Sequence, residues 1–232
     1  MCTKVVAVDV RALSEKLKAP VAQPGTTGKS LPADNAPGDV LPTDLAPVIT
    51  HDRPREIRYL RWGLVPAWTQ ELSRVTPMFN AKAETVDQLV SFRDLVMTRR
   101  CLILNQGFYE NEKQGEERVT WKVSPAGEDY FYKAGLWTAW QDAASGQVIE
   151  SFTMITCAPD EGSRFGRIHD RMPVILNKAE RRLWMNPGTS KEQLLALLKP
   201  CSEDLYAVSE YSRKPLRQAK QKTTKPAANL LF

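Results

Sequence analysis

The pattern of apolar and polar positions predicts a chain dominated by β-strands. Short runs of apolar, β-branched and aromatic residues are bounded by turn residues, which is the usual pattern of strands. Gly115 and Gly127 mark hairpin connections between the central strands. The predicted strands are Cys101–Asn105, Arg118–Val123, Tyr130–Trp137, Ile149–Thr156, Pro173–Leu176 and Leu205–Val208.

Helix start signals are fewer. Thr85 and Asn177 each precede a Gln or Glu by three residues, as in a capping box, and Ser190 begins a third candidate that Pro200 ends. These signals predict helices at residues 85–97, 178–185 and 190–198, and residues 5–18 read as a strand turning into a short helix. Because strands dominate without strict βα alternation, we predict a single α+β domain on a curved, barrel-like mixed β-sheet with flanking helices.

Residues 20–54 differ in composition from the rest of the chain. They hold seven of the 16 prolines, and proline at this density opposes long helices and central strands. We therefore predict a long, extended surface loop within a domain of residues 1–212. After it, residues 213–232 carry six basic and no acidic residues and are expected to form a disordered tail.

Composition excludes several classes of protein. The 232 residues are 42% hydrophobic and 25% charged, which is ordinary for a soluble globular protein, and no apolar run approaches the ~20 residues of a membrane span. The four cysteines are scattered without a CxxC pair, so neither a zinc site nor a disulfide framework is expected. The net charge of +5 comes mainly from the tail. We expect a cytoplasmic monomer without a metal site.

Cys2 is the first candidate for chemistry. Removal of Met1 would leave a cysteine whose amine and thiol are both free, a 1,2-aminothiol that no internal cysteine can supply. The amine can condense with an aldehyde, and the thiol can then close a thiazolidine ring. The two groups titrate near pH ~8 and ~8.5, so both are partly nucleophilic at neutral pH.

Three further residues have types suited to proton transfer or orientation. His169 lies where a charged turn enters the apolar segment 172–176, a plausible place for an acid–base group, whereas His51 in the proline-rich segment is expected to be exposed. Glu110 follows two aromatic residues, and partial desolvation there would raise its pKa. Asn80 precedes the first predicted helix and could orient an amine or a sugar hydroxyl, or simply serve as a turn residue.

The segment Arg61–Trp68 combines a cation, two indoles and turn residues. Aromatic rings beside cations suit a surface that stacks bases and follows phosphates. The alternative is that the tryptophans are core residues beside a turn, and we expect this of one of the two.

Together these segments resemble the SOS-response-associated peptidase (SRAP) family of abasic-site processing proteins. The resemblance runs from Cys2 through six further segments in the family's order: 61–68, 79–85, 99–103, 107–110, 152–158 and 169–176. It implies a protein that senses abasic sites in single-stranded DNA and crosslinks to them through Cys2, without a cofactor. It also implies peptidase activity toward Met1 and lyase-type chemistry on abasic DNA.

The resemblance further assigns residue roles. Cys2 would be the nucleophile, Asn80 would orient the amine and the sugar, Glu110 would shuttle protons, and His169 would hydrogen-bond the sugar oxygen. The residues implied in DNA binding are Lys4, Arg61, Trp62, Lys82, Thr156 and Arg171.

Three positions depart from the family's pattern. Cys2 is followed by Thr3-Lys4 where Gly-Arg is usual, Lys82 stands where arginine is common, and Asn111 stands where tryptophan is usual. We therefore expect the catalytic residues to be intact and DNA binding to be weaker or shifted.

Two other functions fit the residues. An N-terminal-nucleophile hydrolase would use Cys2 against an amide carbonyl, with its own amine as the base. A non-catalytic single-strand binder would use Trp62 and the basic tail. Asn80, Glu110 and His169 together favour imine and sugar chemistry over simple acyl transfer, and a Cys2→Ala variant that kept all function would favour the binder.

Overall fold

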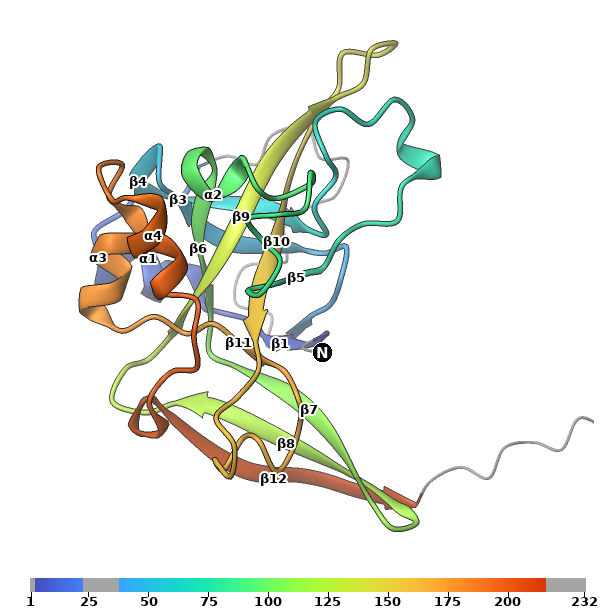
Figure 1. The fold of residues 1–232 in the computed structure, drawn as a ribbon, viewed down its shortest axis with the longest axis vertical. Helices are drawn as coiled ribbons and strands as arrows, with labels where there is room; N and C mark the ends of the chain where they lie inside the picture. Colours follow the sequence, from blue (N-terminus) through green and yellow to red (C-terminus); the bar gives the residue numbers. More distant parts are fainter. Residues whose placement is uncertain (1–2, 23–37, 216–232) are drawn as a thin grey trace, which may run out of the picture.

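A closed β-barrel forms the centre of the molecule (Figure 1). The computed structural model describes residues 3–22 and 38–215. The barrel strands follow the order β10-β4-β3-β6-β9, and β9 also pairs with β10, which closes the ring. β4 and β10 are parallel while the other barrel pairs are antiparallel, so the predicted barrel-like mixed sheet is confirmed. The barrel strands are β3 (Leu45–Thr50), β4 (Arg53–Trp62), β6 (Arg100–Asn105), β9 (Phe131–Gln141) and β10 (Val148–Cys157).

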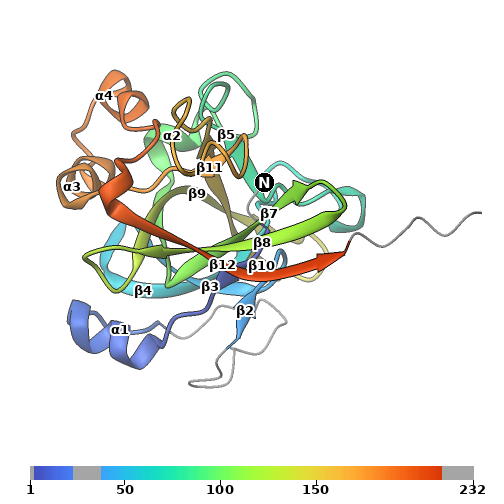
Figure 2. The same cartoon turned by 90° about the horizontal axis from the view of Figure 1, so that it is seen from below.

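A second, antiparallel sheet lies below the barrel in Figure 1, with the order β12-β8-β7-β1-β2. Short strands β5 and β11 pair with β10. Figure 2 shows β7, β8 and β12 side by side, and β1 pairs with the other edge of β7. The strands are β1 (Val5–Val6), β2 (Asp39–Val40), β5 (Asn80–Lys82), β7 (Gly107–Gln114), β8 (Glu117–Pro125), β11 (Met172–Pro173) and β12 (Tyr206–Pro215).

Within the described residues four helices pack around the barrel, and three were predicted closely. They are α1 (Val10–Leu17), α2 (Leu95–Thr98), α3 (Lys178–Met185) and α4 (Lys191–Ala196). Asn177 and Ser190 cap α3 and α4, each through a capping box; the box at Asn177 was predicted, whereas the one predicted at Thr85 begins no helix. These boxes satisfy backbone donors at the helix ends with side chains only three residues apart, so the local sequence suffices to specify them. Short 3-10 helices lie at Leu72–Arg74 and Glu203–Leu205.

The prediction of a single surface loop over residues 20–54 is wrong in part. β3 lies inside that range and is buried between β4 and β6. Its proline, Pro47, pairs with Tyr59 of β4, whereas the pairing with β6 covers only residues 48–50. Pro47 has no backbone N–H to donate. It is tolerated because β6 does not pair with the strand at this residue. Residues 23–37 of the predicted loop lie outside the described residues.

Other elements also differ from their predictions. Between residues 85 and 98 only α2 is helical, because Leu89 and Val90 are exposed while Val86, Phe92 and Val96 are buried, a spacing that no continuous helical face provides. The predicted strand at 173–176 shortens to β11 plus an isolated bridge at Ile175. Strands β4 and β7 were missed. β12 continues to Pro215, three residues beyond the predicted domain end, and the rest of the predicted tail lies outside the described residues.

Candidate functional site

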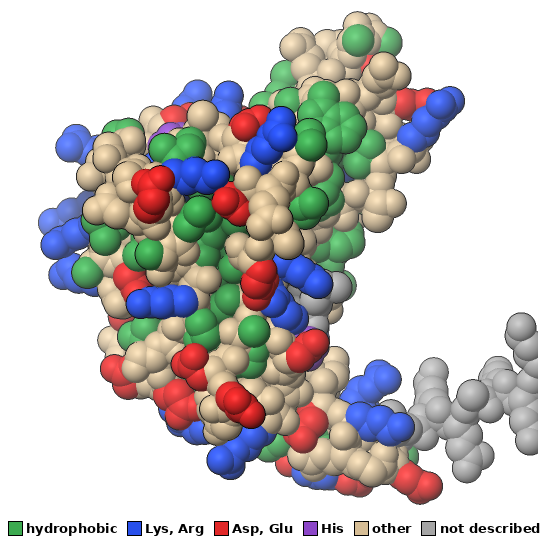
Figure 3. Space-filling model, viewed as in Figure 1, with side chains coloured by type: hydrophobic (Ala, Val, Ile, Leu, Met, Phe, Trp, Pro, Cys, Tyr) green, Lys and Arg blue, Asp and Glu red, His purple; other side chains and the backbone are tan. Residues whose placement is uncertain are grey.

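Glu110 and His169 meet in an open cavity of about 380 Å³. On the face drawn in Figure 3, the molecule is hollowed between its upper part and the lower sheet, and both basic and acidic side chains lie along the hollow. The cavity size falls within the ~300–1,000 Å³ range of small-molecule sites. Its lining also includes the start of the described chain and part of β12: the residues are Thr3, Lys4, Tyr109, Glu110, Asn111, Thr120, His169, Tyr211, Ser212 and Lys214. Cys2 itself lies outside the described residues, but Thr3, the residue after it, lines this cavity.

Strand pairing carries Glu110 into the cavity. β7 begins at Gly107 with a φ of +154°, and a side chain there would collide with the Val123 carbonyl oxygen at 2.7 Å. β1 then pairs with β7, and the Tyr109 backbone N–H donates to the Lys4 carbonyl at 3.1 Å. The start of the described chain is thereby held beside Glu110, whose side chain is only 4% exposed.

Burial raises the pKa of Glu110 to about 7. The negative charge of Asp170 contributes in the same direction, whereas the positive charge of Lys133 lowers the pKa. A carboxyl group that titrates near neutral pH can both accept and donate a proton during a reaction. This confirms the predicted desolvation of Glu110 behind its two aromatic neighbours.

His169 faces Glu110, with 3.7 Å between Nε2 and Oε2 of the carboxylate. Its other nitrogen, Nδ1, lies 3.0 Å from the Arg171 backbone N–H and 2.7 Å from Asp170 Oδ1. The amide can only donate and the carboxylate can only accept, so the first contact requires Nδ1 without a hydrogen and the second requires Nδ1 with one. Partial burial lowers the pKa of His169, which favours the neutral form.

A lysine that sequence reasoning missed lies beneath Glu110. The side chain of Lys133, on β9, is completely buried. Its Nζ lies 4.0 Å from the centre of the Phe108 ring and 5.5 Å from that of Phe131. Phe108 and Glu110 are two residues apart on β7, so their side chains lie on the same face of the strand. Lys133, which contacts Phe108, is therefore close enough to interact with the charge of Glu110. The signal was visible as one charged residue inside the apolar run 130–137.

Thr156 and Arg171 contact each other outside the lining of the cavity, next to the strand that carries Asn80. Asn80 and Lys82 lie on β5 beside Met154 and Thr156 of β10, and Asn80 is absent from the lining of the cavity. Arg171 makes two hydrogen bonds to Glu84, at 2.6 and 2.9 Å, and a third to the Thr156 carbonyl. These bonds lower the pKa of Glu84 to about 2. Arg171 therefore ties the turn after His169 to β10 and to the turn that follows β5.

The residues predicted to bind DNA differ in accessibility. Lys82 is exposed, Arg61 is half-buried, and Lys4 forms an ion pair with Asp39 at 2.6 Å. Thr156 is buried. Trp62 is only 1% exposed and its indole N–H donates to the Phe79 carbonyl, which argues against the predicted contact with bases. Trp62 is thus the expected core tryptophan, and Trp68 is the accessible one at 64%.

The internal cysteines have no nucleophilic role in this arrangement. Cys101, Cys157 and Cys201 are free and buried, and burial raises the thiol pKa of Cys157 and Cys201 to about 12. His51 is half-buried, contrary to the prediction that it would be exposed, because it turns the chain between β3 and β4 beside Arg100. Across residues 3–22 and 38–215, no cluster of His, Cys, Asp or Glu is suited to holding a metal ion.

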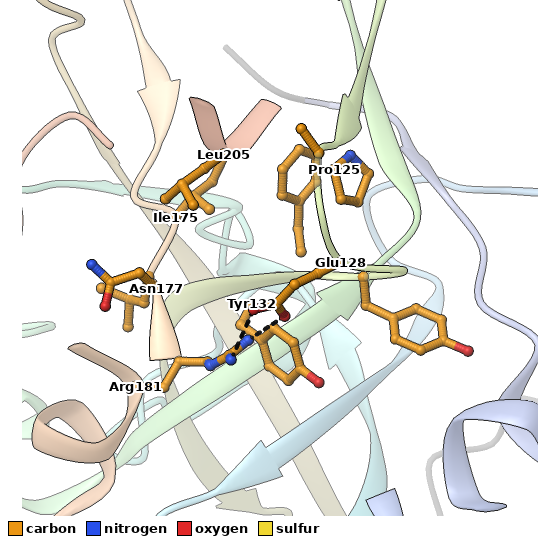
Figure 4. Close-up of a pocket in the computed structure, with 11 residues that line it drawn as sticks. Pro125, Glu128, Tyr132, Ile175, Asn177, Arg181 and Leu205 are labelled. Carbon is orange, nitrogen blue, oxygen red and sulfur yellow. Dashed lines mark hydrogen bonds and ion pairs between the residues drawn. The ribbon is translucent and has the colours of Figure 1, made fainter. Parts of the chain in front are cut away.

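A second pocket lies away from these residues (Figure 4). Arg181 of α3 crosses it, stacked 3.8 Å from the Tyr132 ring centre and bonded to Glu128 at 2.7 Å. Its free volume of about 20 Å³ holds roughly one water molecule. We regard it as a structural contact between α3 and the sheets. None of the helices in the described part of the chain is long and apolar enough to cross a membrane.

Comparison with known proteins gives consistent results. The model of the SOS response associated peptidase (SRAP) family matches residues 1–214. The abasic site processing protein YoqW of Bacillus subtilis is 34% identical over 161 residues, covering 67% of this chain and 70% of that protein. The abasic site processing protein HMCES of Xenopus tropicalis is 29% identical over 175 residues, covering 66% and 52%.

Solved structures show the same fold. A Bacteroides thetaiotaomicron protein aligns with a TM-score of 0.77 at 24% identity, covering 90% of this chain and 91% of its own. A Bordetella bronchiseptica protein aligns with a TM-score of 0.73 at 25% identity, covering 91% and 100%.

Proposed function

This chain belongs to the SRAP family of abasic site processing proteins, and from that membership we propose that it crosslinks covalently to abasic sites in single-stranded DNA through Cys2. The observation that carries the proposal is the Glu110–His169 pair in the same cavity as Thr3, the residue that follows Cys2.

The proposed reaction begins with hydrolysis of the Met1–Cys2 peptide bond, which frees the Cys2 amine. That amine attacks C1′ of the ring-opened sugar aldehyde to give a carbinolamine, and loss of water gives an imine. The Cys2 sulfur then adds to C1′ while the thiol proton passes to nitrogen, which closes the thiazolidine. Amine, thiol, carboxyl and imidazole groups supply every step, so the proposal invokes no metal ion or organic cofactor.

Glu110 is proposed as the proton shuttle. With a pKa of about 7 it can deliver a proton to the departing hydroxyl of the carbinolamine and recover one from the attacking amine. His169 is proposed to bond the sugar oxygen through Nε2, the nitrogen facing the cavity, and to assist sugar-ring opening. Asn80 is proposed to orient the amine and sugar from β5, and Arg171 and Thr156 to hold that strand in place.

DNA binding is proposed to follow the hollow. Lys82 and Arg61 would contact phosphates, and Lys4 would do so by exchanging its ion pair with Asp39. Because Trp62 is buried, the exposed ring of Trp68 would stack on the bases instead. Phosphate contacts of this kind are independent of sequence and weaken with salt. We further propose that the protein acts in the cytoplasm as a monomer.

The test uses mature protein, shown by mass to begin at Cys2, and a single-stranded oligonucleotide with one abasic site. Wild type should give a heat-stable shifted band on a denaturing gel. Cys2→Ala should not, and a tetrahydrofuran analogue, which has no aldehyde, should remain unshifted with wild type. Cys2→Ser should give a band only after borohydride reduction, since it forms the imine without the sulfur adduct. A heat-stable, reductant-independent band with Cys2→Ala would overturn the proposal.

A further inference from the structure

Tyr211 is an exposed aromatic side chain in the wall of the cavity that contains Glu110 and His169. It lies on β12, where the register with β8 shifts between Glu210 and Ser212, so Tyr211 has no partner of its own in the ladder. Such a bulge re-aims a side chain relative to regular strand alternation. Tyr211 is 57% exposed, whereas Glu110 in the lining of the same cavity is buried.

Packing holds this ring in place from one side. Tyr211 meets Tyr109 edge-on, with 4.8 Å between ring centres. Lys4 lies 4.7 Å above the ring of Tyr109 and is anchored by Asp39. Tyr109 is mostly buried and its pKa is raised to about 12, by burial first and by the neighbouring Asp39 and Tyr211 second. The Tyr211 ring is therefore supported by a fixed neighbour while much of its surface stays open.

The rest of the wall indicates which ligand suits the ring. Around Tyr211 the lining is polar and cationic, with Asn111, Thr120, Ser212 and Lys214. The Thr120 hydroxyl donates a hydrogen bond to the Asn111 side chain at 2.8 Å. The residue after Glu110 is therefore a hydrogen-bonded amide and places no aromatic ring next to Tyr211. An apolar ligand would need an apolar lining. One open ring beside an ammonium group instead suits a nucleotide, with its base on the ring and its phosphate near the lysine.

We propose that Tyr211 stacks on an intact base next to the abasic site and that Lys214 binds the adjoining phosphate. The inference rests on the proposed function, because the cavity that holds Tyr211 also holds Glu110 and His169. The ring thus comes from β12, far along the chain from the motif around Glu110, and it places the flanking nucleotide so that the baseless sugar faces the reactive groups.

The experiment measures non-covalent binding in a Cys2→Ala background, using single-stranded oligonucleotides with a tetrahydrofuran abasic analogue. Tyr211→Ala should weaken binding by about 5- to 100-fold, the usual effect of losing one stacked base. Tyr211→Phe should bind as the parent does, because the ring and not the hydroxyl carries the interaction. Lys214→Ala should reduce the salt slope by about one counterion. Leu183→Ala, which trims an exposed apolar side chain of α3, serves as the matched control.

A second set of oligonucleotides locates the stacked base. Each carries a further tetrahydrofuran at one flanking position, so that the base there is missing. When the base at one flanking position is missing, the parent and Tyr211→Ala should bind the oligonucleotide with equal affinity, as a thermodynamic cycle requires for a direct contact. Equal binding by Tyr211→Ala and its parent, or a loss that persists on every oligonucleotide, would overturn the inference. Crosslinking by wild type is scored separately, so failure here is distinguishable from failure of the Cys2 chemistry.

Discussion

Replacing Glu110 by glutamine should stabilise the protein at alkaline pH while removing much of its activity. The carboxyl group is buried, and its pKa is about 7 in the fold against an ordinary 4.5. Between these two values the folded state binds more protons than the unfolded state, so wild-type stability falls as pH rises through this window. Glutamine keeps the shape of the protonated acid and never ionises, so that contribution to the pH dependence should disappear.

The magnitude follows from the two pKa values. The difference between 4.5 and about 7 corresponds to roughly 3 kcal/mol of lost stability once Glu110 is fully ionised. At pH 5 wild type and Glu110→Gln should therefore differ little. At pH 9 the variant should gain up to about 3 kcal/mol relative to wild type. Crosslinking by the variant should fall by about 10²- to 10⁴-fold, as expected when a general acid–base group is removed.

Urea unfolding at several pH values from 5 to 9 measures the stability difference, and denaturing gels measure the crosslinking rate. Glu116→Gln is the matched control, because Glu116 is an exposed glutamate in the turn after β7. Glu116→Gln should not increase the free energy of unfolding at pH 9. Parallel stability curves for wild type and Glu110→Gln would refute the claim that burial raises the pKa of Glu110.

Three further predictions concern other parts of the molecule. Lys133→Met removes a positive charge that lowers the pKa of Glu110, so the pH–rate profile of crosslinking should move to higher pH; an unmoved profile would show that the charge does not act on Glu110. Arg100→Met leaves buried carbonyls of Val96, Met97 and Trp184 without their donor and should cost at least about 3 kcal/mol in urea unfolding, whereas a loss under about 1 kcal/mol would contradict this role. Deleting residues 216–232 removes four basic residues and should weaken non-covalent DNA binding at low salt, measured by anisotropy, while crosslinking persists; loss of crosslinking would show that the tail takes part in the chemistry.

Local sequence determined those features whose interactions span a few residues. The capping boxes at Asn177 and Ser190 and the turns at Gly115 and Gly127 were predictable because the interacting groups are neighbours in the chain. The desolvation of Glu110 could be predicted for the same reason, since the aromatic residues precede it directly. The barrel-like character followed from the abundance of strands.

Tertiary packing decided the rest. β3 was missed because the prolines of residues 20–54 oppose a central strand, and only the short pairing with β6 makes Pro47 acceptable. Composition could not tell Trp62 from Trp68, because their exposure depends on which one the barrel encloses. Lys133 of β9 comes close enough to act on the charge of Glu110 only because the barrel closes, and Tyr211 of β12 reaches the cavity at a bulge. The sequence determined which groups could react, whereas which of them share one cavity depended on contacts between strands that lie far apart in the chain.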